Sequence, residues 1–98
     1  MNLALIILES HVSTESDSFY VDGHYSLSVS GMFGGATVHL QRAVDDVEYN
    51  DVQVFSTEKQ VNGYDPVGNR YKIKIDGADA GTSLVVKVKI HVNRLGGL

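Results

Sequence analysis

An alternation of apolar and polar residues with a period of two recurs along the chain and restricts it to a β fold. From residue 25 to residue 30, apolar side chains take turns with serines. Successive side chains of a strand point to opposite faces, so this pattern predicts a strand with one buried face. Four segments show the alternation: residues 25–30, 36–41, 71–75 and 84–92. Two shorter runs also suit strands: residues 19–21 and 52–55.

Turn-forming residues separate these segments. Asp22–Gly23, Asn62–Gly63 and Asp76–Gly77 are Asx-Gly pairs, which accept the backbone angles of tight turns. The glycine-flanked segment 31–35 predicts a hairpin connection, whereas a short helix within 41–51 is a weaker alternative. We therefore predict an all-β fold, an antiparallel β-sandwich or jelly roll of about seven to eight short strands. A small barrel is the related alternative.

The length and the missing cysteines narrow the classes of protein. With 98 residues, the chain forms one domain over residues 1–98. The absence of cysteine excludes disulfide scaffolds, zinc ribbons and cysteine catalysis. A net charge of −4 makes the chain a poor candidate for binding nucleic acid. We expect no signal peptide and no membrane span, since the apolar run at the N-terminus is far shorter than the roughly 18 residues needed.

That N-terminal run, residues 2–9, is unusual because both of its faces are apolar. Leu3, Leu5 and Ile7 alternate with Ala4, Ile6 and Leu8. A strand that is apolar on both faces is normally buried on both. We therefore expect a cover for its second face, which could be a loop of the same chain, a central position in the sheet, or another subunit. In the last case the strand is an interface, formed by Leu3, Leu5, Ile6 and Leu8.

Neither the histidines nor the acidic residues have the spacing of a metal or catalytic site. The histidines are scattered, at His11, His24, His39 and His91. The acidic cluster lacks the EF-hand pattern, and it consists of Asp45, Asp46, Glu48 and Asp51. A P-loop and a Gly-x-Ser-x-Gly motif are also missing. We predict no catalytic, cofactor-binding or metal-binding residue and a protein that is not an enzyme. A small hydrolase that uses the acidic cluster is a weaker alternative.

Four lysines lie at outward positions of two predicted strands. They would form one basic stripe if those strands paired, and such a stripe could meet an acidic partner. We expect instead that they are a solvated face. They are Lys72, Lys74, Lys87 and Lys89.

Residues 25–42 resemble a segment of small β-sandwich virion proteins of tailed bacteriophages. The resemblance lies in the run Gly31-Met32-Phe33-Gly34-Gly35-Ala36, followed by the alternating 37–41 and the acidic turn at Asp45. Residues 71–86 look like the closing hairpin of the same proteins, so the resemblance spans roughly residues 25–92. Two features depart from it: the aromatic residue is Phe33 where those proteins often have tryptophan, and the acidic turn lacks glycines.

The resemblance implies a capsid decoration or cement protein that binds the major capsid protein or another virion protein. We expect a virion protein made in the host cytoplasm, with no nucleic acid, membrane or small-molecule partner. We also expect a homotrimer, because icosahedral shells offer three-fold sites. Candidate docking residues are the N-terminal strand and the turn residues Met32 and Phe33. The alternative is a tail or neck adaptor or fibre-associated sandwich that binds carbohydrate or a receptor through its five tyrosines.

Overall fold

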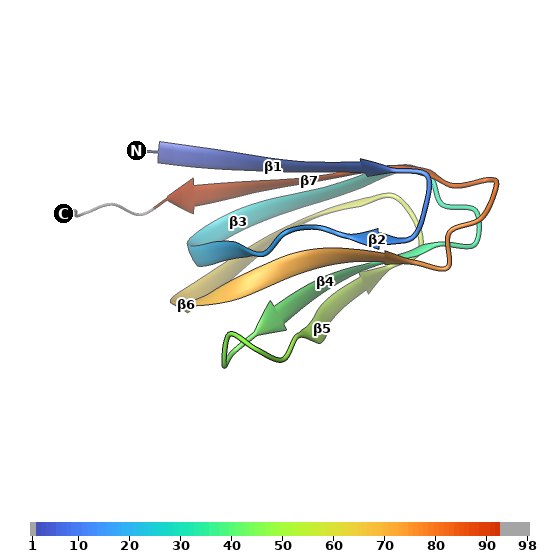
Figure 1. The fold of residues 1–98 in the computed structure, drawn as a ribbon. Coiled ribbons are helices and arrows are strands. Elements are labelled where there is room, and N and C mark those ends of the chain that lie inside the picture. Colours follow the sequence, from blue (N-terminus) through green and yellow to red (C-terminus); the bar gives the residue numbers. More distant parts are fainter. Residues whose placement is uncertain (1, 93–98) are drawn as a thin grey trace.

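The computed structural model describes the backbone of residues 2–92 and the side chains of residues 5–90 (Figure 1). Every regular element in this part of the chain is a β-strand, and no helix forms within residues 41–51 or elsewhere in it. The strands are β1 (Asn2–Ser10), β2 (Thr14–Glu15), β3 (Phe19–Met32), β4 (Thr37–Ala43), β5 (Asn50–Phe55), β6 (Lys59–Asp76) and β7 (Ser83–Val92).

Two long strands, β3 and β6, run through both layers of the molecule. They have 14 and 18 residues, and they pair antiparallel with each other on both sides of a shared bend. The first layer contains β1, β7, the second half of β3 and the first half of β6, in that order. The second layer contains β2 and the first half of β3, then the second half of β6, β4 and β5. Figure 1 shows the two layers facing each other.

The pairings are nested in the manner of a jelly roll. β1 pairs with β7, β3 with β6, and β4 with β5, all antiparallel. The chain is thus one long hairpin that closes at the β4–β5 loop and folds over on itself. The prediction of an antiparallel β-sandwich or jelly roll is confirmed. Two of its strands are long rather than short, because each crosses from one layer to the other.

The core lies between the layers and contains the residues that the alternation assigned to inner faces. Leu27 and Val29 of β3 are 1% exposed, and so are Val86 and Val88 of β7. The second layer contributes a matching set of buried side chains: Val38, Leu40, Phe55, Tyr71, Ile73 and Ile75. Because the chain has neither tryptophan nor cysteine, aliphatic packing and a few aromatic rings fill this core.

Several predicted turns and hairpins are wrong. Asp22–Gly23 and Asn62–Gly63 lie inside β3 and β6 instead of between strands. The segment 31–35 does not close a hairpin, because the second half of β3 and β4 lie in different layers and do not pair. Residues 71–86 do not form the predicted closing hairpin, because β6 and β7 do not pair either. Within the part of the chain that the structure describes, only β4 and β5 pair as sequence neighbours.

A buried carboxylate organises the bend of β6. Three residues of β6 lie between Asp65 and Asn69, opposite the single residue that separates Val21 from Gly23 on β3. The Asp65 carboxylate is 2% exposed. It accepts hydrogen bonds at 2.7–3.1 Å from the backbone N–H groups of residues 67 and 68, the Asn69 amide and the Tyr71 hydroxyl. Four donors thus hold the backbone in the bulge that carries the ribbon from one layer to the other.

Aromatic rings cover two glycines beside this bend. A Cβ on Gly63 would lie 2.1 Å from the ring of Tyr25, and a Cβ on Gly68 would lie 2.0 Å from the hydroxyl of Tyr20. Gly68 also has a φ of +87°, which other residues rarely adopt. Gly63 is therefore required for space, because Tyr25 is buried, and Gly68 is required for its backbone conformation, because the exposed Tyr20 could move aside.

Burial and hydrogen bonds at the bend together shift the pKa values of Asp65 and Tyr71 in opposite directions. Burial opposes ionisation of Asp65, but its donors, with Asn69 and Tyr71 foremost, outweigh burial and hold the pKa of that carboxyl below its ordinary value. Burial, followed by the bond to the Asp65 carboxylate, raises the pKa of Tyr71 to about 12. The pair is thus held with the carboxylate ionised and the phenol neutral.

We expect Asp65→Asn to lower the free energy of unfolding by about 3 kcal/mol, because it removes a buried charge that four donors are built to satisfy. Urea unfolding at pH 7 measures the change. Asp45→Asn is the matched control. Asp45 also accepts from two backbone N–H groups, those of Val47 and Glu48, but in an exposed loop. Equal effects of the two substitutions would contradict the assigned role of Asp65.

We expect Tyr71 to make stability depend on alkaline pH. As pH rises above its ordinary pKa of 10.0, the unfolded chain loses the phenol proton first, so stability falls until about pH 12. The loss amounts to about 2–3 kcal/mol. Unfolding curves from pH 8 to 11.5 should show that the stability gap between the native chain and Tyr71→Phe narrows above pH 10. A gap that stays constant would contradict this prediction.

Candidate functional site

The N-terminal strand β1 lies at the rim of the first layer. It pairs over nine residues with β7, without a register shift, and its other side faces no strand of the described chain (Figure 1). Ile6 and Leu8 point inward and pack against the core, although both stay partly exposed. Leu5 and Ile7 point outward and are 59% and 51% exposed. β1 is therefore an edge strand with apolar residues on both faces.

This arrangement overturns two of the three expected covers for the second face of β1. The strand is not central in its sheet, and no described loop of the same chain covers Leu5 or Ile7. The side chain of Leu3 lies outside the described residues. Among the predicted interface residues, Ile6 and Leu8 belong largely to the core, whereas Leu5 forms an exposed surface together with Ile7. Another subunit stays the predicted cover.

The Met32–Phe33 turn divides its two side chains between solvent and core. Met32 is 65% exposed, whereas Phe33 packs against the end of the core. The Phe33 carbonyl accepts hydrogen bonds from the Ala36 amide and the Thr82 hydroxyl, at 2.9 and 2.8 Å. Gly31 has a φ of +110°, and a Cβ there would lie 2.1 Å from the Ser83 carbonyl oxygen. Phe33 thus packs partly buried on the core, and Met32 is the more exposed of the two.

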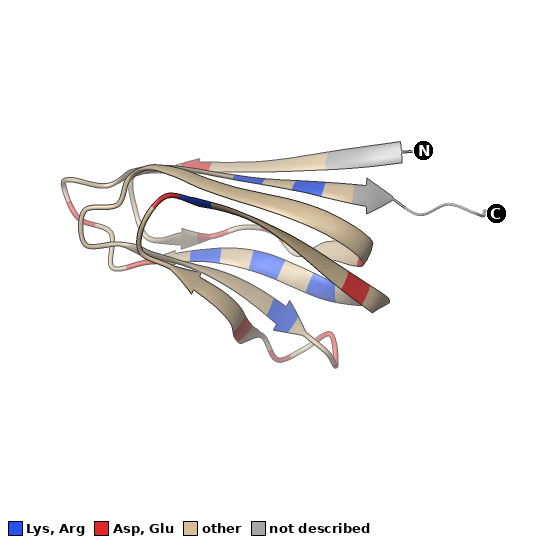
Figure 2. Cartoon of the chain, turned by 180° about the vertical axis from the view of Figure 1, so that it is seen from behind, with Lys and Arg blue, Asp and Glu red and all other residues tan. Residues whose placement is uncertain are grey.

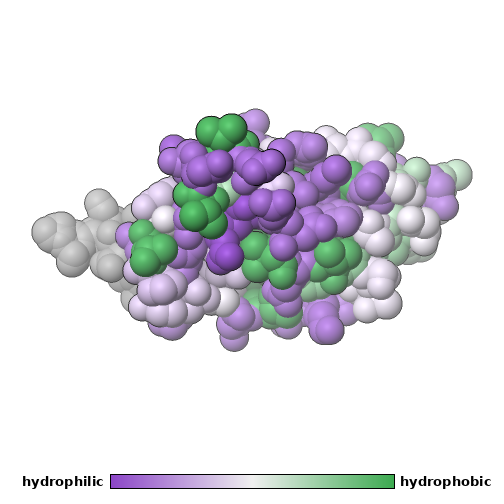
Figure 3. Space-filling view, turned by 90° about the horizontal axis from the view of Figure 1, so that it is seen from below, coloured by the Kyte–Doolittle hydropathy of each residue, from purple (hydrophilic) through white to green (hydrophobic). Residues whose placement is uncertain are grey.

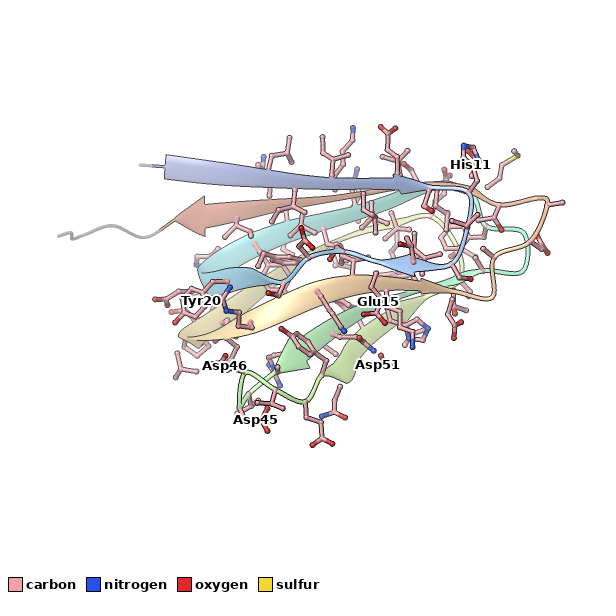
Figure 4. The ribbon with its side chains drawn as sticks, in the orientation of Figure 1. His11, Glu15, Tyr20, Asp45, Asp46 and Asp51 are labelled. Atoms are coloured by element: carbon pink, nitrogen blue, oxygen red, sulfur yellow. The ribbon has the colours of Figure 1, made fainter. Side chains whose placement is uncertain are left out.

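The β1–β2 turn, the Met32–Phe33 turn and the β6–β7 loop join the two layers at one end of the molecule, which we call the loop end. Nδ1 of His11 lies 3.3 Å from the Thr82 carbonyl oxygen and ties the β1–β2 turn to the β6–β7 loop (Figure 4). The hydroxyl of Thr82 accepts from the Asp79 amide, so the loop is braced internally. Val12 is 64% exposed beside His11. Met32, which pairs with Ser83, and Val12 are therefore two exposed apolar side chains on a braced end of the sandwich.

The predicted acidic cluster does not converge on one point. The Asp45 carboxylate accepts hydrogen bonds from its own loop, where Asp46 has a positive φ of 64° (Figure 4). Asp51 lies on β5, and hydrogen bonds from Gln41 and then His39 hold its pKa below the ordinary value. In the described part of the chain, no three His, Asp or Glu side chains could hold a metal ion. His91 lies outside the described side chains.

The four lysines do not form one stripe, because their strands lie in different layers (Figure 2). Lys72 donates to Glu15 at 2.6 Å and lies 4.5 Å from the centre of the Tyr49 ring. This hydrogen bond and the charge of Lys72 lower the pKa of Glu15. Lys87 and Lys89 lie on the outer face of the first layer, where none of the described carboxylates forms an ion pair with either.

A shallow groove of about 620 Å³ runs over the outer face of the first layer, beside Leu5. Apart from Leu5 and the inner residues beneath it, polar and basic side chains line this groove: Ser26, Ser28, Gln60, Asn62, Lys87 and Lys89. Ser26 donates to Asn62 at 2.8 Å across the two strands. No tyrosine lines this groove.

The tyrosines do not form a shared binding face. Tyr25 and Tyr71 are buried in the core. Tyr49 lies beneath Lys72 in the second layer. Tyr20 is exposed on the first half of β3 (Figure 4), and Tyr64 is exposed on the first half of β6, where its ring lies 4.5 Å from that of His24. These two exposed rings therefore belong to different layers.

Exposed apolar side chains also occur outside β1. Viewed from the β5 side, they form separate spots among polar residues (Figure 3). Val52 and Val54 of β5 and Val44 and Val47 of the β4–β5 loop are exposed in this way. Single exposed apolar residues are common on protein surfaces. β5 is also an edge strand, but its pairing with β4 has a register shift and it carries Asp51, whereas β1 pairs with β7 in continuous register.

Searches of protein-family models, curated proteins and solved structures gave no match to the chain. Residues 2–92 contain no helix long and apolar enough to cross a membrane.

We expect Phe33→Ala and Met32→Ala to separate the two roles within the turn. Phe33→Ala should lower the free energy of unfolding by about 1–2 kcal/mol, because it removes a partly buried ring from the end of the core. Met32→Ala should change it by less than about 0.5 kcal/mol. Thermal and urea unfolding of the two variants measure the difference. A larger loss from Met32→Ala would show that this side chain is part of the core.

Proposed function

We propose that the protein is a non-enzymatic structural protein of a tailed-phage virion, made in the host cytoplasm, that decorates the capsid and binds its major capsid protein. The observation that carries the proposal is β1, an edge strand whose outward Leu5 and Ile7 are exposed. Apolar residues along an open edge favour contact with another protein chain. The jelly roll supports the proposal because viral capsid domains often have this architecture, although the fold by itself assigns no function.

A decoration protein needs two kinds of contact, one with its own copies and one with the shell. The molecule offers two separate exposed apolar surfaces of this kind. One is the β1 edge with Leu5 and Ile7, and the other is the loop end with Val12 and Met32. The braced loops at that end would dock with little loss of conformational entropy. We assign β1 to self-association and the loop end to the capsid.

A tail or neck adaptor that binds glycans is the alternative, and the groove beside Leu5 favours it. Its serine, amide and lysine side chains could hydrogen-bond to sugar hydroxyls and pair with an acidic group. The exposed tyrosines contribute no stacking platform to that groove. Binding of acidic oligosaccharides by the purified protein, lost in Lys87→Ser with Lys89→Ser, would favour the adaptor over the decoration protein.

We expect particles that lack the protein to lose resistance to heat and osmotic shock, and added protein to restore it. The double variant Val12→Ser with Met32→Ser should fail to bind such particles, because it removes the apolar groups of the loop end. Co-sedimentation with purified particles measures binding, and survival of infectivity at raised temperature measures protection.

The matched control is Val44→Ser with Val47→Ser, which removes two valines from the β4–β5 loop that are at least as exposed as Val12 and Met32. This control should bind and protect as the native protein does. Particles without any copy of the protein, together with unchanged stability after its gene is deleted, would overturn the proposed function.

A further inference from the structure

β1 differs from the other sheet edges in having no feature that prevents pairing with a further strand. Proteins protect such edges with short strands, bulges, prolines and charged residues. β2, at one edge of the second layer, has two residues. β5, at its other edge, carries Asp51 and a register shift opposite Leu40 and Gln41. The first half of β6 begins at Lys59, contains Gly63 and ends at the Asp65 bulge.

β1 has none of these features apart from one charged residue near its end. Its nine residues pair with β7 in continuous register, and they include no lysine, proline or glycine. Glu9, one residue from the end, is its only charged residue. Its outward backbone N–H and C=O groups have no strand partner within the described chain. The backbone groups along the whole outer edge of β1 are thus spaced to pair with another extended strand.

The side chains of β1 restrict the chemistry of that occupant. Leu5 and Ile7 are exposed on the outer face, and Ile6 and Leu8 are only partly buried on the inner face. A strand placed beside β1 would therefore meet apolar groups on both faces. It must itself be apolar on both faces, in contrast to the alternating strands of this fold. Among the described strands, β1 is the one that has this property along its length.

We propose that two copies of the chain pair through β1, antiparallel and about a two-fold axis, so that two first layers join into one continuous sheet. Full overlap of Asn2–Ser10 with itself places Ile6 opposite the partner's Ile6 and Leu5 opposite the partner's Ile7. The four outward residues of the two copies then form one apolar cluster, and the inward Ile6 and Leu8 gain a neighbour at the rim of the core. A two-fold interface of this kind uses the same surface on both subunits.

Charge favours the antiparallel arrangement over the parallel one. In the antiparallel pair, Glu9 lies opposite residue 3 of the partner, six residues away from the partner's Glu9 along the strand. The two carboxylates are then roughly 20 Å apart, at 3.4 Å per residue. In a parallel pair in register they would lie on adjacent strands, where like charges oppose pairing.

This inference names the partner of the β1 surface and rests on its assignment as a protein contact in the proposed function. It replaces the trimer expected from three-fold capsid sites with a two-fold dimer. The two proposals can fail separately. Self-association is measured on the purified protein without any particle, and capsid binding is measured through the loop-end variants.

We expect the native protein to sediment as a dimer of two 10.7 kDa chains at micromolar concentration. Leu5→Lys with Ile7→Lys should be monomeric, with a dimer dissociation constant raised about 100-fold or more, because lysines would replace the outer cluster at the edge. Val44→Lys with Val47→Lys adds the same charges at exposed positions away from the edge and should stay dimeric. Circular dichroism verifies that both variants fold.

Cysteine cross-linking tests the register independently, because the native chain has no cysteine. Residues that face each other across an antiparallel pair have Cα atoms roughly 4.5–5.5 Å apart, within the range of a disulfide. A mixture of Leu5→Cys and Ile7→Cys proteins should therefore give more oxidised dimer than either protein alone. Dimerisation that survives Leu5→Lys with Ile7→Lys would overturn the proposal. So would a native protein that is monomeric or trimeric, or a mixture that cross-links no better than its components.

Discussion

The buried Asp65 carboxylate is the interaction on which the rest of the structure depends. Its four donors hold the bulge at which β6, with β3 beside it, passes from one layer to the other. The ribbon of β3 and β6 belongs to both layers, so the bend decides which faces of these strands meet in the core. Without it, the nested hairpin would remain one open sheet with an exposed apolar face.

The bend also decides the position of β1. Since the second half of β3 lies in the first layer, β7 can pair with it on one side and with β1 on the other. β1 is consequently last in its sheet, and Leu5 and Ile7 are left in solvent. The surface that we assign to self-association therefore follows from how the core closes. A small core made mainly of aliphatic side chains would gain stability from a neighbour along that rim.

The strand faces were predictable because alternation is a local signal. Leu27, Val29 and Ile73 are inward as predicted, and Lys72 is outward. The turns were less predictable, because an Asx-Gly pair does not always end a strand. Asn62–Gly63 stays within β6 because the Tyr25 ring covers the glycine, and that contact joins residues far apart in the sequence. Only part of the candidate site could be predicted. The sequence indicated a strand that is apolar on both faces, but it did not indicate that this strand lies at the edge of the sheet.

The sequence by itself determined that the fold is all-β and which residues its strands bury. It also determined that residues 2–9 are apolar on both faces, unlike the alternating strands. These properties follow from periodicity and composition within short segments. Only the tertiary structure decided the order of the strands, the layer to which each half of β3 and β6 belongs, and the exposure of Leu5, Ile7 and Met32. The physical reason is that the strand order depends on pairing between segments far apart in the sequence, such as β1 with β7 and β3 with β6, which no short segment encodes.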